Sequence, residues 1–188
     1  MHEFASVLHE NPVIAALRQP AALERVLRSK CKMAFLLAGN IETLADTISL
    51  LHAHGKRAYV HMDLMDGFGR DRHAIRFICG RAGADGIITT HSQMVRAAKE
   101  EGVFVIQRLF LIDTLSLRSG LQSAKRNMPN AVEIMPGIIS NISRRVCEEL
   151  TVPVIAGGFI CTKDDIILSL SAGAVGISTG APELWDME

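Results

Sequence analysis

Two short stretches near the carboxyl terminus have the residue types of an anion-binding site. Gly157-Gly158 and Ser178-Thr179-Gly180 each follow a short apolar run. Glycine lets backbone N–H groups approach an anion without a Cβ in the way, and a helix N-terminus after Thr179 would add free N–H groups and a positive dipole end. We expect these residues to bind a phosphate or a similar small anion. The alternative is that the glycines only form tight turns.

Two arginines lie where charge is costly. Arg18 and Arg108 stand at the end of, or inside, otherwise apolar runs. A charge there must be paired, and the guanidinium fork suits a carboxylate or a phosphate. Asp63, Asp113 and Glu133 are the candidate partners within the chain. The sequence leaves internal pairing and contact with a ligand equally open.

His61, Asp63 and Glu133 could perform acid–base chemistry or bind a metal ion. Alternation along a strand places His61 and Asp63 on the same side. The pattern has low specificity, because a polar barrel interior needs the same groups for mutual hydrogen bonding. No strand end carries the desolvated lysine that a Schiff-base aldolase requires. We therefore assign no catalytic residue and no metal site.

Eight short apolar runs must position these residues. Gly, Pro, Asn or Asp bounds the runs and amphipathic stretches separate them, which is the pattern of strands buried on both faces. The intervals fit βα units. The runs are Val13–Leu17, Met33–Ala38, Arg57–Met62, Gly86–Thr89, Val103–Leu109, Ala131–Met135, Pro153–Ala156 and Ala174–Ser178.

Eight strand–helix units predict a single-domain (β/α)8 TIM barrel over residues 1–188. Such barrels typically need ~250 residues, so we expect short loops and an abbreviated last helix within 181–188. An open flavodoxin-like sheet would leave three strands unexplained. Chemistry on a barrel occurs at the carboxyl ends of the strands, which gives the candidate ligand-binding residues Arg18, Asp63, Arg108, Glu133, Gly137, Gly157, Gly158, Ser178 and Thr179.

Composition excludes several classes of protein. The chain is 48% hydrophobic with 20 basic and 20 acidic residues, so it is neither disordered nor generally basic. It contains no apolar run long enough for a membrane span and no secretory signal. Its four cysteines form no CxxC pair. We expect a cytoplasmic protein with reduced thiols and no membrane partner.

The sequence resembles the glycerol-3-phosphate-responsive antiterminators along nearly its whole length. The IQRLFLID and EIMPG segments are the most specific part of the resemblance. The segments that carry it are Asn11–Arg18, Val60–Leu64, Asp85–Thr90, Ile106–Asp113, Val132–Gly137, Pro153–Ile160 and Glu183–Trp185.

The resemblance implies a small TIM-barrel regulator of transcription. Such a protein binds sn-glycerol 3-phosphate as its effector, without a further cofactor. It then binds the leader mRNA of glycerol-utilisation genes and prevents termination. The strand-end residues given above are the positions where we expect the effector. Gly180 departs from the family, where a small polar residue is more usual. Whether the chain forms a homo-oligomer stays open.

The RNA-binding side has weaker support. Aromatic residues are few, and no RNA-binding motif is present. Two other functions remain as alternatives: an enzyme acting on a phosphorylated polyol or sugar through Glu133 or Asp63, and a phosphate-binding barrel that signals to a protein. Three clusters of basic residues could contact RNA phosphates, although charged helix faces are normally just solvated: Arg25, Arg28, Lys30 and Lys32; Arg70, Arg72, Arg76 and Arg81; and Arg118, Lys125 and Arg126.

Overall fold

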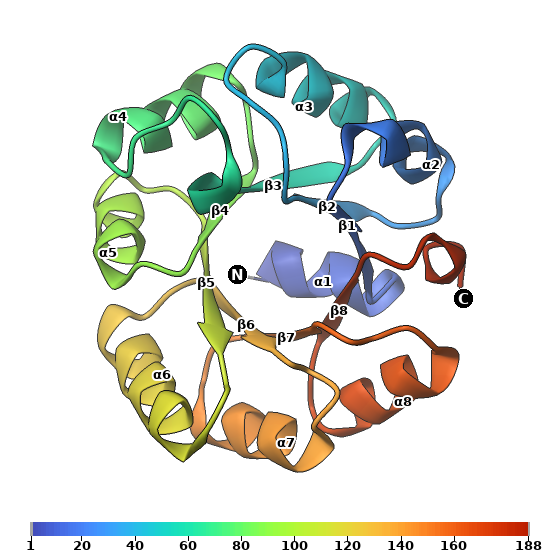
Figure 1. The fold of residues 1–188 in the computed structure, drawn as a ribbon, viewed down its shortest axis with the longest axis vertical. Coiled ribbons are helices and arrows are strands. Elements are labelled where there is room, and N and C mark those ends of the chain that lie inside the picture. The colour runs from blue at the N-terminus through green and yellow to red at the C-terminus, as the bar shows by residue number, and fades with distance from the viewer. Residues whose placement is uncertain (1, 188) are drawn as a thin grey trace.

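The strands close into one barrel in the computed structural model, which describes residues 2–187 (Figure 1). They are parallel, follow one another in chain order, and β8 pairs with β1. The predicted TIM barrel is confirmed, and the expected strand ends shift by no more than two residues. The strands are β1 (Val13–Leu17), β2 (Met33–Leu36), β3 (Arg57–His61), β4 (Gly86–Thr89), β5 (Val105–Phe110), β6 (Ala131–Met135), β7 (Val154–Gly157) and β8 (Gly176–Thr179).

Helices surround the barrel and cover its outer face (Figure 1). Side-chain caps mark the start of α4 and α8: Asp71 Oδ1 accepts the Ala74 N–H at 2.9 Å, and Thr162 forms a capping box with Asp165. After α4 the chain continues as a π-helix, Arg76–Arg81. The helices are α1 (His2–Glu10), α2 (Leu23–Arg28), α3 (Leu44–Ala53), α4 (Arg72–Ile75), α5 (Ser92–Glu100), α6 (Thr114–Asn127), α7 (Ser140–Glu149) and α8 (Lys163–Ser171).

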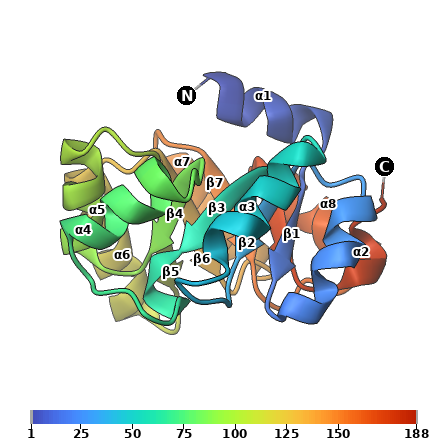
Figure 2. The same cartoon turned by 90° about the horizontal axis from the view of Figure 1, so that it is seen from above.

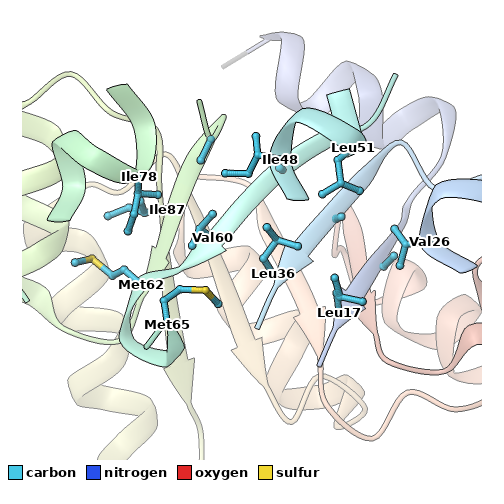
Figure 3. Close-up of a cluster of buried hydrophobic side chains, with 14 of the residues drawn as sticks. Leu17, Val26, Leu36, Ile48, Leu51, Val60, Met62, Met65, Ile78 and Ile87 are labelled. Carbon is cyan, nitrogen blue, oxygen red and sulfur yellow. The ribbon is translucent and has the colours of Figure 1, made fainter. Parts of the chain in front are cut away.

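Alternating side chains of the strands build two apolar layers. Ile14, Phe35 and Ile106 belong to the inner layer, which fills the barrel. The outer layer packs strands against helices, and Figure 3 shows part of it: Leu36, Val60 and Ile87 from the strands beside Val26, Ile48 and Ile78 from the helices. Burial on both faces explains why the strands read as continuous apolar runs. The carboxyl ends of the strands therefore stand on a rigid frame.

The apolar runs do not predict α1, which lies across the amino-terminal end of the barrel (Figure 2). Phe4 packs against the inner layer, with its ring centroid 5.5 Å from that of Tyr59 and 4.8 Å from that of Phe104. Phe4 and Leu8, one helical turn apart, are both buried. This helix covers the end of the barrel opposite to the strand ends that carry the candidate site.

The abbreviated last helix is a single 3₁₀ turn, η4 (Pro182–Leu184). Trp185 follows it, is buried, and donates its indole N–H to the Thr179 carbonyl at 2.9 Å. Glu188, the end of the predicted segment, lies outside the described residues. None of the helices within residues 2–187 combines the length and apolar character that a membrane crossing requires.

Candidate functional site

A cavity of about 580 Å³ opens at the carboxyl ends of the strands. The segments that follow β7 and β8 form much of its wall, through Gly158, Phe159, Ser178 and Gly180. Its volume is in the range of small-molecule sites, ~300–1,000 Å³. A second cavity, about 620 Å³, lies beside α1 at the other end of the barrel, but no lysine or arginine lines it.

Arg18 is the one charged residue that lines the cavity at the strand ends. Its side chain is exposed, and within residues 2–187 it has no ion-pair partner. Gly180 lies beside it, since a Cβ added there would be 3.5 Å from Arg18 Nε. An unpaired guanidinium facing a cavity without a carboxylate favours an anionic ligand. Internal pairing of Arg18 with Asp63, Asp113 or Glu133 is absent from the described structure.

Gly157 and Gly158 give the cavity part of its shape. A Cβ on Gly157 would lie 2.8 Å from Glu133 Oε1 and 3.1 Å from Met135 Cε, so only glycine leaves this space open. Gly158 has φ +80°, a left-handed conformation that glycine adopts readily. The register of β7 and β8 directs the Gly158 N–H at the Ser178 carbonyl. The N–H groups of Phe159 and Gly180 make no backbone hydrogen bond within the described chain. Two donors are thus free at the wall where the sequence predicts an anion site.

Ser178 and Thr179 have different surroundings, although the sequence grouped them as ligand residues. Both side chains are buried. Both residues line the cavity, but the Ser178 Oγ has no hydrogen-bond partner in the described structure. The Thr179 hydroxyl donates to the Ile160 carbonyl at 2.7 Å and accepts the Ala181 N–H at 3.1 Å. Thr179 therefore fixes the two loops of the wall through its side chain, and Ser178 is the hydroxyl available to a ligand.

Arg108 and Glu133 form a buried ion pair beneath the cavity. They are direct neighbours in the register of β5 and β6, and Arg108 Nε donates to Glu133 Oε2 at 2.7 Å. Exposure of the side chains is 5% and 0%, respectively. The second polar atoms of the pair, Arg108 Nη2 and Glu133 Oε1, have no partner in the described structure. Buried polar atoms without partners are costly, and neither residue lines the cavity above them.

Asp63 is held by the residues that follow β4. Its carboxylate accepts the Thr90 N–H at 2.8 Å, the Thr90 hydroxyl at 3.0 Å and the Thr89 hydroxyl at 2.9 Å. His61 Nδ1 lies 3.9 Å from Asp63 Oδ2. Burial, together with the charge of Arg108, lowers the pKa of His61 to about 4, against the opposing effect of Asp63. At neutral pH this imidazole is therefore uncharged.

Gly137 lies against β7 and does not line the cavity. Its N–H donates to the Gly157 carbonyl at 2.6 Å, and its carbonyl accepts the Ser143 hydroxyl at 2.9 Å. A Cβ here would lie 2.6 Å from Ala156 Cβ. The structure thus gives this residue a packing role under the site. Within residues 2–187, no three His, Cys, Asp or Glu side chains are grouped so that they could hold a metal ion.

Sequence reasoning missed the apolar rim of the cavity, formed by Phe110, Ile112 and Phe159. These side chains are 51%, 86% and 77% exposed. Phe159 also has φ +59°, which is rare for a bulky residue. The signal was present in the sequence, since Phe159 directly follows Gly158 and Phe110 lies two residues after Arg108.

The model of the family described as "glycerol-3-phosphate responsive antiterminator" matches residues 13–185. The chain belongs to this family. The antiterminator match includes every strand of the barrel and every candidate site residue named above. It confirms the resemblance carried by the IQRLFLID and EIMPG segments.

Two solved structures share this fold along nearly their whole length, and one further relative is similar in sequence. A glycerol uptake operon antiterminator regulatory protein from Listeria monocytogenes is 30% identical, with a TM-score of 0.90 over 95% of this chain and 96% of that chain. A glycerol uptake operon antiterminator-related protein from Thermotoga maritima is 29% identical, with a TM-score of 0.82 over 92% and 96%. The uncharacterized protein YgcP of Escherichia coli strain K12 is 35% identical over 96% of this chain and 95% of its own.

Proposed function

We propose that this protein is an antiterminator that responds to sn-glycerol 3-phosphate. The effector binds in the cavity at the strand ends, and the loaded protein binds the leader mRNA of glycerol-utilisation genes and prevents termination. Membership of the family supports a regulator. Effector binding is supported above all by the position of Arg18. It is an unpaired cation in a cavity with no carboxylate at its wall.

The cavity offers separate groups to the two halves of the effector. Arg18 and the N–H groups of Phe159 and Gly180 suit the phosphate, because charge-assisted hydrogen bonds are the stronger ones. Ser178 Oγ, which lies on the same wall, suits a glycerol hydroxyl. Effector and RNA must then strengthen each other's binding by the same factor, because coupling between sites is reciprocal.

Thermal unfolding tests effector binding and identifies the ligand. At a concentration of about 100 Kd, sn-glycerol 3-phosphate should raise Tm by roughly 5–10 °C, since this adds about 2.7 kcal/mol. Glycerol and inorganic phosphate at the same concentration should have little effect. An equal shift with inorganic phosphate, or conversion of glycerol 3-phosphate to a product, would contradict the proposal.

Arg18→Gln should weaken effector binding by about tenfold or more, because one charge-assisted contact is lost. The matched control is Arg144→Gln on α7, which removes another exposed arginine that has no ion-pair partner in the described structure. Calorimetry gives both dissociation constants. A single-round transcription assay on a leader terminator then tests the output: read-through should require protein and effector together.

A further inference from the structure

Four of the eight arginines in the three basic clusters form ion pairs with carboxylates of the described chain. Arg25 pairs with Asp186 and Arg28 with Glu24, on or beside α2. Arg72 and Arg76 pair with Glu100 and Glu101, as one ion-pair group between α4 and α5. An ion pair must be given up before such a cation can bind a phosphate. Within the described residues, Arg70 and Arg81 are the arginines of the first two clusters that pair with no carboxylate, and Arg81 lies over the Phe77 ring. The paired arginines make these clusters poor surfaces for a polyanion.

A groove between α5 and α6 has the opposite character. These helices are neighbours on the outside of the barrel (Figure 1). The groove has a volume of about 240 Å³, and Arg96 and Arg126 line it together with Ser119, Gln122, Ser123 and Asn127. Within the described residues neither arginine contacts a carboxylate, and Arg96 Nη1 donates only to Asn127 Oδ1 at 3.3 Å. The sequence contains no Asp or Glu from 114 to 132.

Hydrogen bonds hold the groove in shape. The Ser123 hydroxyl lies 2.8 Å from Ser92 Oγ, so it joins α6 to α5. It also accepts from Gln107 Nε2 of β5 at 2.8 Å and from Asn127 Nδ2 at 3.1 Å. A surface fixed in this way loses little conformational entropy when a ligand binds.

The groove continues toward the open end of the barrel. A second hollow of about 400 Å³ lies at the start of α5, where Arg70, His91, Ser92, Gln93 and Met94 line it. Ser92 belongs to both hollows. Arg70 has no ion-pair partner within residues 2–187. The result is a strip of three unpaired arginines, in the order Arg126, Arg96 and Arg70, whose one apolar lining residue is Met94.

We infer that this strip, formed by the α5–α6 groove and the hollow at the start of α5, is the surface that binds RNA, through the phosphates of a single strand. The inference rests on the proposed function. Charge complementarity favours a polyanion, and the serine, glutamine and asparagine side chains add donors for phosphate or ribose oxygens. A protein partner would need an apolar interface centre, which the strip does not offer.

The salt dependence of RNA binding tests this surface. The probe is a fluorescein-labelled, mixed-sequence RNA of 30 nucleotides, with sn-glycerol 3-phosphate present, because the phosphate contribution to binding does not depend on sequence. The double variant Arg96→Gln/Arg126→Gln should bind about tenfold more weakly or worse. Its slope of log Kobs against log salt should be smaller by about 1.4, the value for two lost phosphate contacts on a single strand.

Arg25→Gln/Arg28→Gln is the matched control, because it removes two ion-paired charges from α2 and should leave the slope unchanged. Arg96→Lys/Arg126→Lys should restore the slope, which a folding defect would not. Thermal shifts with the effector verify that each variant is folded.

Each contrary outcome has a distinct meaning. The first is that the unmodified protein binds RNA and the salt slope of Arg96→Gln/Arg126→Gln is unchanged. This result overturns the assignment of the RNA-binding surface and leaves the proposed function intact. The second is that the effector raises Tm but the unmodified protein binds no RNA. This result overturns both the proposed binding of leader mRNA and the assigned surface. Tighter binding of a labelled polyglutamate peptide than of RNA assigns the strip to an acidic protein and overturns the inference.

Discussion

Glu133 is a fully buried carboxylate whose charge is balanced by Arg108. Glu133→Gln leaves the buried guanidinium without its counter-charge, and removal of one partner of a buried pair typically costs about 3–5 kcal/mol. We expect a loss of that size in the free energy of unfolding, measured with urea. The double variant Arg108→Met/Glu133→Leu should recover most of it, because apolar side chains of similar volume replace both charges. A single variant as stable as the double would contradict this explanation.

His61 makes the protein less stable in acid. Its pKa is lowered to about 4 in the folded protein, so the unfolded chain binds a proton more readily below its ordinary pKa, about 6.5. The free energy of unfolding therefore falls between pH 6.5 and 4, by at most about 3 kcal/mol. His61→Gln should reduce this acid-induced loss in urea titrations at pH 7, 5.5 and 4.5. His73→Gln, which removes an exposed histidine, should not.

The sequence could have separated Ser178 from Thr179, because successive residues of a strand face opposite sides. The sequence could not identify which of the candidate carboxylates pairs with Arg108, because the contact with Glu133 depends on the register between β5 and β6. Whether Arg18 has a partner is likewise a matter of three-dimensional placement. Residue types and strand ends thus predicted the candidate set. The structure places Arg18, Gly158, Ser178 and Thr179 at the cavity and the other candidates away from its wall.

At the scale of elements, Gly137 lets the segment after β6 pack closely on β7. Gly137→Ala would place a methyl group 2.6 Å from Ala156 Cβ and 2.7 Å from the Gly157 nitrogen, which is backbone that cannot move freely. We expect a destabilisation of about 1–3 kcal/mol and weaker effector binding, because the Gly157-Gly158 segment shifts. Gly80→Ala is the control, since no atom lies within 4 Å of its added Cβ. Equal stability of the two variants would contradict the packing role.

The strands, which are buried on both faces, could be predicted from the sequence. The position of α1, which depends on a contact with residues far away in the chain, could not. The eight strands show as apolar runs because helices cover them outside and the inner layer covers them inside. The Asp71 and Thr162 caps lie within three residues of their partners and so leave a local signal. The helix α1 owes its burial to Phe4 packing on Tyr59 and Phe104, far away in sequence. Nothing local predicts where it lies.

At the scale of the whole molecule, the two proposed sites lie in different parts of one rigid barrel. The effector cavity is built from the ends of β7, β8 and β1, and the RNA strip from the start of α5 and its groove with α6. A regulator needs a physical connection between them. Asp63 is placed to provide it, because it lies beside His61, which senses the charge of Arg108, and it also holds Thr89 and Thr90.

Thr89 continues that connection to the RNA strip, since its hydroxyl accepts the His91 N–H at 3.1 Å, directly before α5. We therefore expect Asp63→Asn to lower the coupling, which is the factor by which glycerol 3-phosphate tightens RNA binding, while RNA still binds without effector. By reciprocity, RNA must lose the same factor in its effect on effector affinity, so two titrations provide independent measurements. Asp85→Asn is the control. Asp85 also accepts a backbone N–H, that of Ala58 in β3, but at the opposite end of the barrel. Unchanged coupling in Asp63→Asn would show that the signal travels through other contacts, such as those of the loops at the cavity wall.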